Sequence, residues 1–345
     1  MKIACVTRVV LALLALLTLP TAISIAETPS DVRASTVLFG EFETVFYSKA
    51  DLLAAVASYA VAKGDTRDLP KSNIYDGISN GSLSILNLPF AFLADGLETV
   101  RKGNSVSVLR NSESVLVGAR DFSAPNAFGM SLSQFCYVIV LDKRRGLNFS
   151  TSFRDLHVAS SVDGNVVWTW LGKLHEGHPK PITYYAAIIS GSYLLLSNNL
   201  DVLKVTAGEL NSSTLVSSPR QLPSLTQVSQ HEYWAYRRPI HGGAIGKDPS
   251  YLFELTTHAE ALLFFADLTE KVGVFQIFGQ SVDEKEVAKM NTFLAQKQGG
   301  TTPLLKFKLA SVGMCEATID LSVKGPLQGL DMVPIIGWFG FTIYM

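Results

Sequence analysis

The chain has 345 residues, of which 48% are hydrophobic and 17% are charged, with 29 basic and 30 acidic side chains. Such a composition is the opposite of a disordered profile, and it lets the chain bury one large core or two smaller ones. No excess of Lys and Arg is present to neutralise phosphates, so nucleic acid is not an expected partner.

The first 26 residues are typical of a cleaved bacterial signal peptide. Lys2 and Arg8 give a positive start, Val9–Leu19 is apolar, and Ser24-Ile25-Ala26 offers the small residues that cleavage after Ala26 requires. The apolar stretch is shorter than the roughly 20 residues of a membrane-spanning helix, which makes a retained anchor the weaker alternative. Removing two of the 29 basic residues, against 30 acidic ones, leaves the mature chain at −3. We therefore expect export to the periplasm or the medium, with membrane contact only through the signal before cleavage.

The next part of the chain, residues 27–212, combines a few helical patterns with many strand patterns. Apolar residues at helical spacing predict helices, whereas short β-branched and aromatic runs bounded by turn residues predict strands. The expected elements are a strand at Thr36–Phe39, helices from Ser48 to Gly64 and from Pro89 to Lys102, a hairpin of Ser105–Arg110 and Ser114–Ala119, a buried strand at Gln134–Leu141, hairpins at Ser152–Leu171 and Thr183–Ser197, and a helix capped by Asn198 or Asn199.

Residues 213–230 are rich in Ser, Pro and Gln and predict a linker or long loop. A second part, residues 231–345, resumes the strand pattern and is either a separate unit or packed into the same domain. Strands that follow one another through short turns predict antiparallel pairing, so the expected class is α+β, largely antiparallel sheet with a few packed helices. The expected elements of this part are strands at Tyr233–Tyr236, Ala261–Leu268, Val272–Phe278, Leu304–Ser311 and Cys315–Val323, and a helix from Asp283 to Gln298.

Two cysteines remain after Cys5 leaves with the signal. In an oxidising compartment Cys136 and Cys315 could form one disulfide, and the alternative is two buried thiols. No two cysteines lie close together in sequence, which excludes a structural zinc site of the usual kind.

A serine-hydrolase hypothesis rests on Gly77-Ile78-Ser79-Asn80-Gly81, which matches the G-x-S-x-G pattern of a nucleophile elbow. Ser79, Asp248 and His258 follow one another in the chain order of such a triad. However, the elbow requires a strand before the serine and a helix after it, and the polar residues before Gly77 are a poor strand. A turn in a polar loop is therefore the preferred interpretation.

A metal-binding hypothesis rests on His175-Glu176-Gly177-His178, in which two imidazoles lie three residues apart. A third ligand from elsewhere could complete a site. Because Gly177 and Pro179 make this segment a connection between strands, an exposed polar turn is the preferred interpretation.

Two pairs of residues are candidates for binding a ligand. Trp168 and Trp170 share one face of a strand, where a flat ligand could stack, although rings of this kind more often pack in a core. Arg237 and Arg238 follow Trp234 and Tyr236 and could bind an anion.

The segment from Ile189 to Asn199, continuing to Leu203, resembles a strand–turn–helix element of exported bacterial proteins that have no assigned activity. The resemblance implies a location outside the cytoplasm and assigns no site residue. We therefore expect an exported, non-catalytic envelope or secreted protein that binds a ligand or partner without a cofactor, with the hydrolase and the metal-binding protein as alternatives.

Overall fold

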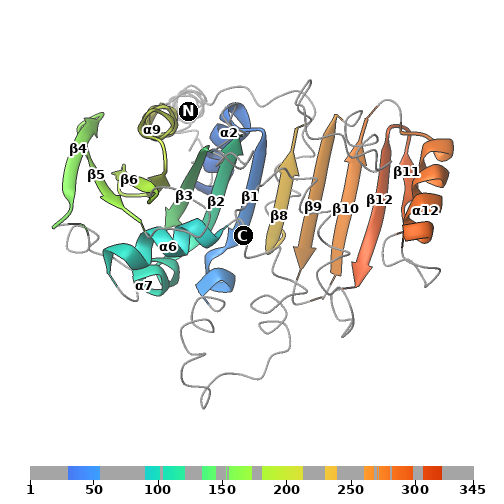
Figure 1. The fold of residues 1–345 in the computed structure, drawn as a ribbon, viewed down its shortest axis with the longest axis horizontal. Helices are drawn as coiled ribbons and strands as arrows, with labels where there is room; N and C mark the ends of the chain where they lie inside the picture. Colours follow the sequence, from blue (N-terminus) through green and yellow to red (C-terminus); the bar gives the residue numbers. More distant parts are fainter. Residues whose placement is uncertain are drawn as a thin grey trace, which may run out of the picture.

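The computed structural model of the chain describes residues 30–54, 90–101, 104–120, 134–144, 153, 155–172, 181–212, 230–238, 260–267, 270, 272–279, 282–297 and 306–320. They form one large antiparallel sheet with helices packed on it (Figure 1), which confirms the predicted α+β class. The strands are β1 (Thr44–Lys49), β2 (Ser112–Arg120), β3 (Gln134–Leu141), β4 (His157–Val162), β5 (Asn165–Leu171), β6 (Thr183–Ile189), β7 (Tyr193–Ser197), β8 (Tyr233–Arg237), β9 (Ala261–Asp267), β10 (Val272–Phe278), β11 (Lys308–Ser311) and β12 (Met314–Asp320). The helices are α2 (Ser30–Glu41), α6 (Ala91–Val100), α7 (Asn104–Arg110), α9 (Leu200–Asn211) and α12 (Glu284–Lys297).

The twelve strands lie in the order β11-β12-β10-β9-β8-β1-β2-β3-β7-β6-β5-β4. β1 is paired along both edges, to β2 on one side and to β8 on the other. Strands from residues 27–212 and from residues 231–345 therefore belong to one sheet, although the two parts are separate in the sequence. Of the predicted linker 213–230, all but Gln230 lies outside the described residues.

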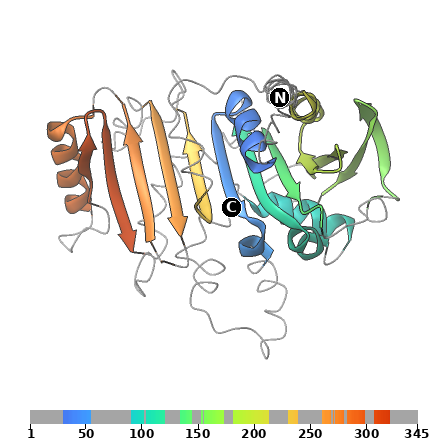
Figure 2. The ribbon, with the colours of Figure 1, turned by 180° about the vertical axis from the view of Figure 1, so that it is seen from behind.

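Helices pack on both faces of the part of the sheet that β1, β2 and β3 form. Alternate side chains of a strand point to opposite faces, so Phe46 packs with α6 and α7 whereas Val45 and Tyr47 pack with α2 and α9. Figure 1 and Figure 2 show these two helix pairs from opposite sides. Each face therefore has its own core, and the described strands separate them.

Two predicted hairpin turns and one predicted helix cap are confirmed. Asp163 and Gly164 have φ of 47° and 80°, and Ser190 and Gly191 have φ of 52° and 63°. Positive φ at two successive residues is the type I′ geometry that matches the twist of paired strands. The side chain of Asn199 accepts the first backbone N–H groups of α9, as expected for an N-cap.

Two predicted strands are wrong, and one predicted helix begins later than expected. The strand predicted at Thr36–Phe39 lies within α2, where residues 34–39 are all buried and show no helical alternation of polar and apolar side chains. The strand predicted at Ser105–Arg110 is α7, whose first turn is held by the Glu98 carboxylate, which accepts the backbone N–H of Ser105. The helix expected from Ser48 begins at Ala50, after β1.

Gly118 of β2 gives a direct test of how the sheet packs under α2. The ring of Phe42 occupies the place where a β-carbon at Gly118 would lie. We expect Gly118→Ala to lower the free energy of unfolding by about 1–3 kcal/mol, because overpacking displaces a buried ring. Urea denaturation of the chain from residue 27 measures it.

Gly208→Ala in α9 is the matched control, because nothing lies within 4 Å of its β-carbon position. That change should stabilise the protein by about 0.4–1 kcal/mol. Equal effects of the two substitutions would contradict the packing of Phe42 on β2.

Candidate functional site

Five of the candidate residues lie outside the described part of the chain. The triad and metal hypotheses therefore stay predictions. These residues are Ser79, Asp248, His258, His175 and His178.

Trp168 and Trp170 lie side by side on one face of β5 and are half-buried. The ring of Phe153 stacks on Trp168 with centroids 5.2 Å apart, and it lies 5.9 Å from Trp170. Trp170 in turn stacks on Tyr184 of β6 at 5.8 Å, and its indole N–H donates to the carbonyl of Gly96 in α6 at 3.0 Å. Both rings are thus held in place by neighbouring aromatic groups, and their predicted ligand-binding role stays a prediction.

Tyr184 anchors this aromatic group to α6. Its hydroxyl donates to a carboxylate oxygen of Asp95 at 3.0 Å. Burial, and to a lesser degree the negative charge of Asp95, raise the pKa of Tyr184 well above its usual range. The phenol therefore keeps its proton at physiological pH and keeps donating to Asp95, which fixes the β5–β6 pair against α6.

Next to Trp168, two valines are exposed on the same face of the sheet. Val158 of β4 lies directly opposite Trp168 and is 55% exposed, and Val166 lies two residues before Trp168 and is 41% exposed. We call Val158, Val166 and Trp168 the edge strip, because β4 is the last strand of the sheet. Figure 1 shows β4 at the end of the sheet away from α12. Exposed apolar side chains grouped beside a fixed aromatic ring are typical of an interaction surface.

Arg237 and Arg238, the other predicted ligand-binding pair, lie at the end of β8. Arg237 is 6% exposed. The Arg238 guanidinium donates to the carbonyl of Phe42 at 2.9 Å and, more weakly, to that of Gly40 at 3.5 Å. Arg238 therefore supports the connection between α2 and β1, and the predicted anion site stays a prediction.

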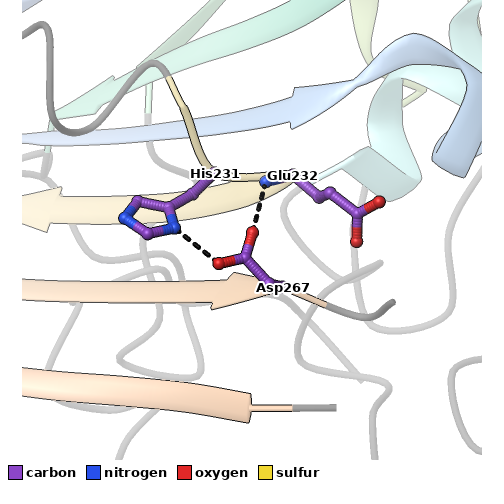
Figure 3. A network of polar contacts seen from close by, with 3 residues as sticks. All are labelled: His231, Glu232 and Asp267. Atoms are coloured by element: carbon purple, nitrogen blue, oxygen red, sulfur yellow. Dashed lines mark hydrogen bonds and ion pairs between the residues drawn. The ribbon is translucent and has the colours of Figure 1, made fainter. Parts of the chain in front are cut away.

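The structure also brings together a histidine and an aspartate that sequence reasoning missed (Figure 3). His231 Nδ1 lies 2.7 Å from one carboxylate oxygen of Asp267, and the other oxygen accepts the backbone N–H of Glu232 at 3.2 Å. The His231 ring also stacks on Phe265, with centroids 4.2 Å apart. The two side chains are 36 residues apart, so only the pairing of β8 with β9 could have revealed them.

A histidine oriented by a carboxylate can act as a general base when a hydroxyl or thiol lies within hydrogen-bond reach. No serine or cysteine of the described segments contacts His231. What the contacts do establish is a tie between the turn before β8 and the end of β9.

Two kinds of feature are absent from the described residues. No group of three or more His, Cys, Asp or Glu side chains there is arranged to hold a metal ion. No helix of the described segments is long and apolar enough to cross a membrane.

The structure distinguishes the two alternatives for the cysteines, because Cys136 and Cys315 do not form a disulfide. Cys136 lies on β3 and Cys315 on β12, six strand positions apart in the sheet. At about 4.8 Å per position the separation is about 29 Å, whereas a disulfide needs Cα atoms within about 7 Å. The two side chains also pack on opposite faces of the sheet, and both are buried free thiols.

Comparison with known proteins assigns no family to the chain. No family model matches it, and no curated protein matches it. Among solved structures, crystal forms I, III and IV of TP0453 are similar in outline, at 8%, 7% and 7% identity with TM-scores of 0.38, 0.39 and 0.42. The alignments cover 89%, 88% and 88% of this chain and 97%, 96% and 95% of the TP0453 chains. A likeness at this level assigns no function.

The state of the two cysteines is directly measurable. Burial raises the pKa of both thiols to about 12, so at pH 8 they are protonated as well as inaccessible. We expect the native chain from residue 27 to react with no equivalent of Ellman's reagent at pH 8, and with two equivalents once it is unfolded in guanidinium without a reductant. Absence of reaction in the unfolded chain would instead demonstrate a disulfide.

Proposed function

We propose that this chain is an exported, non-catalytic protein that binds a protein partner at the β4 end of its sheet. The observation that carries the proposal is the edge strip, where Val158 and Val166 are exposed beside the half-buried ring of Trp168. The proposal of export rests on the features of residues 1–26.

The edge strip has two properties that favour recognition of a protein. First, Trp168 is stacked on Phe153, so it loses little conformational freedom when a partner covers it. Second, the strip borders the outermost strand, where unpaired backbone N–H and C=O groups can bind an extended segment. Apolar contact and backbone hydrogen bonds are thus available along the same border.

A small ligand is the less favoured occupant of this surface. Trp170 already lies against both Phe153 and Tyr184, and Trp168 is stacked on Phe153, so neither ring is fully open for a sugar to stack on. The valines add area suited to another apolar surface.

Intact-mass spectrometry of the full chain expressed in a bacterial host tests signal cleavage and the serine-hydrolase alternative together. We expect the mass of a chain that begins at Glu27, because the features of residues 1–26 favour cleavage after Ala26. After incubation with a fluorophosphonate probe, we expect that mass to be unchanged.

Ser79→Ala is the control for the probe. A single adduct on the folded wild type that disappears in Ser79→Ala would make the protein a serine hydrolase and end the non-catalytic proposal. Recovery of the chain with residues 1–26 still attached would contradict cleavage.

A further inference from the structure

The two ends of the sheet are built differently, and the β11 end is protected. β11 has only four residues and begins with Lys308, which pairs with Glu316 of β12 at 3.0 Å. Beside it, the Asn291 amide of α12 donates to the carbonyl of Phe307 and accepts its backbone N–H, both at 2.8 Å. Figure 1 and Figure 2 both show α12 standing next to β11. Short length, a lysine and a covering helix are the usual means of blocking an edge strand.

The β4 end lacks the short length and the lysine that protect β11. β4 has six residues, and none of them is Asp, Glu, Lys or Arg. His157, Val158, Ala159 and Ser161 are all exposed. An uncharged, exposed edge strand of this length is a template for pairing with another strand.

The turn after β4 determines which backbone groups point outward. Val162 and Asn165 flank the two-residue turn and form its closing pair, so their N–H and C=O groups bond to each other across the hairpin. Hydrogen-bonded and non-hydrogen-bonded pairs alternate along an antiparallel ladder. The next pair, Ser161 with Val166, is therefore non-hydrogen-bonded, and the N–H and C=O of Ser161 point away from β5. The Ser161 carbonyl accepts a long hydrogen bond from the Ser160 hydroxyl at 3.4 Å, which leaves its second lone pair and the Ser161 N–H available to a neighbouring strand.

The side chains of β4 divide between the two faces of the sheet in a symmetric way. Val158 lies opposite Trp168 and Ser161 lies opposite Val166, so both belong to the face that carries the edge strip. His157 lies opposite Thr169 and Val162 lies opposite Asn165, on the other face. The register shift between Val158 and Ser160 produces this arrangement, because it inserts one extra residue into β4.

We propose that the partner at this edge is a second copy of the chain, joined by antiparallel pairing of β4 with β4 about a two-fold axis. This inference rests on the proposed function and names the partner of that surface. Residues directly opposite each other in a sheet share a face. The register that pairs the whole of β4 meets this condition on both faces, with Val158 opposite Ser161 of the second copy and His157 opposite Val162 of the second copy.

This register uses the full length of β4 and places no like charges opposite each other. It also brings the edge strips of both copies onto the same face of a continuous sheet, where the exposed Val158 side chains lose contact with water. An isologous contact of this kind closes on itself and forms a dimer rather than a fibre. An unrelated extended segment would fit equally well only if its side chains were distributed between the two faces of the sheet as those of β4 are.

Val158→Lys tests the dimer most directly. Val158 is exposed in the single chain, so a lysine there does not disturb the fold. In the dimer, one lysine from each copy would lie where the two β4 strands pair. Sedimentation velocity of the chain from residue 27 should show a dimer for wild type. We expect Val158→Lys to raise the dissociation constant by about tenfold or more, since lysines at an edge oppose pairing.

Val312→Lys is the matched control, because Val312 is 98% exposed in the turn between β11 and β12 at the opposite end of the sheet. It should leave the dissociation constant unchanged.

Ser161→Pro is the second variant, since it removes an outward N–H without removing a hydrogen bond of the β4–β5 ladder. It should weaken the dimer as Val158→Lys does, and circular dichroism reports whether it is folded.

A wild-type chain that stays monomeric up to high micromolar concentration would overturn the inference. So would a dimer that Val158→Lys leaves intact, or one that Val312→Lys dissociates. These outcomes are independent of the intact-mass test. A fluorophosphonate adduct would end the non-catalytic proposal whatever the oligomeric state. A monomeric wild type would end the dimer inference without making the protein a hydrolase.

Discussion

The pairing of β1 along both of its edges holds the described sheet together. Its six residues bond to β2 on one side and to β8 on the other, although β8 follows far later in the chain. Two further backbone bonds extend the β1–β8 seam at its ends, from Lys49 to Glu232 at 2.9 Å and from Arg238 to Glu43 at 2.8 Å. Above the seam, Trp234 stacks on Tyr47 with centroids 5.3 Å apart. Without β1 the sheet would separate into two smaller sheets, each with a newly exposed edge.

This continuity explains why we place function at an end of the sheet. Every interior strand of the described sheet is paired on both sides, so among the described strands only β4 and β11 have an edge that pairs with no other strand. The Asn291 amide of α12 binds the backbone beside β11, whereas β4 carries the exposed Val158 and no Asp, Glu, Lys or Arg. Because β4 belongs to the same continuous sheet as β1, the edge strip is carried by a sheet and not by a loop.

Sequence reasoning succeeded where the determining interactions are local. β3 was predicted from Gln134 to Leu141, and the Asp163-Gly164 turn and the Asn199 cap each depend on residues within a few positions of one another. It failed where distant packing decides. α2 packs against both the sheet and α9, which removes the helical pattern of polar residues, and the His231–Asp267 contact exists only because β8 pairs with β9. The separation of the cysteines and the unequal protection of the two edges likewise follow from strand order, which the sequence does not reveal.

Hydrogen–deuterium exchange in increasing urea tests most directly whether β1 and β8 belong to one cooperative sheet. Peptides covering β1, β3 and β8 of the chain from residue 27 would be followed by mass spectrometry. We predict that all three are protected in the native protein and lose protection at the same urea concentration, because opening the β1–β8 seam breaks the sheet on both sides of it. Exchange of β8 at a urea concentration at which β1 and β3 remain protected would contradict the single sheet.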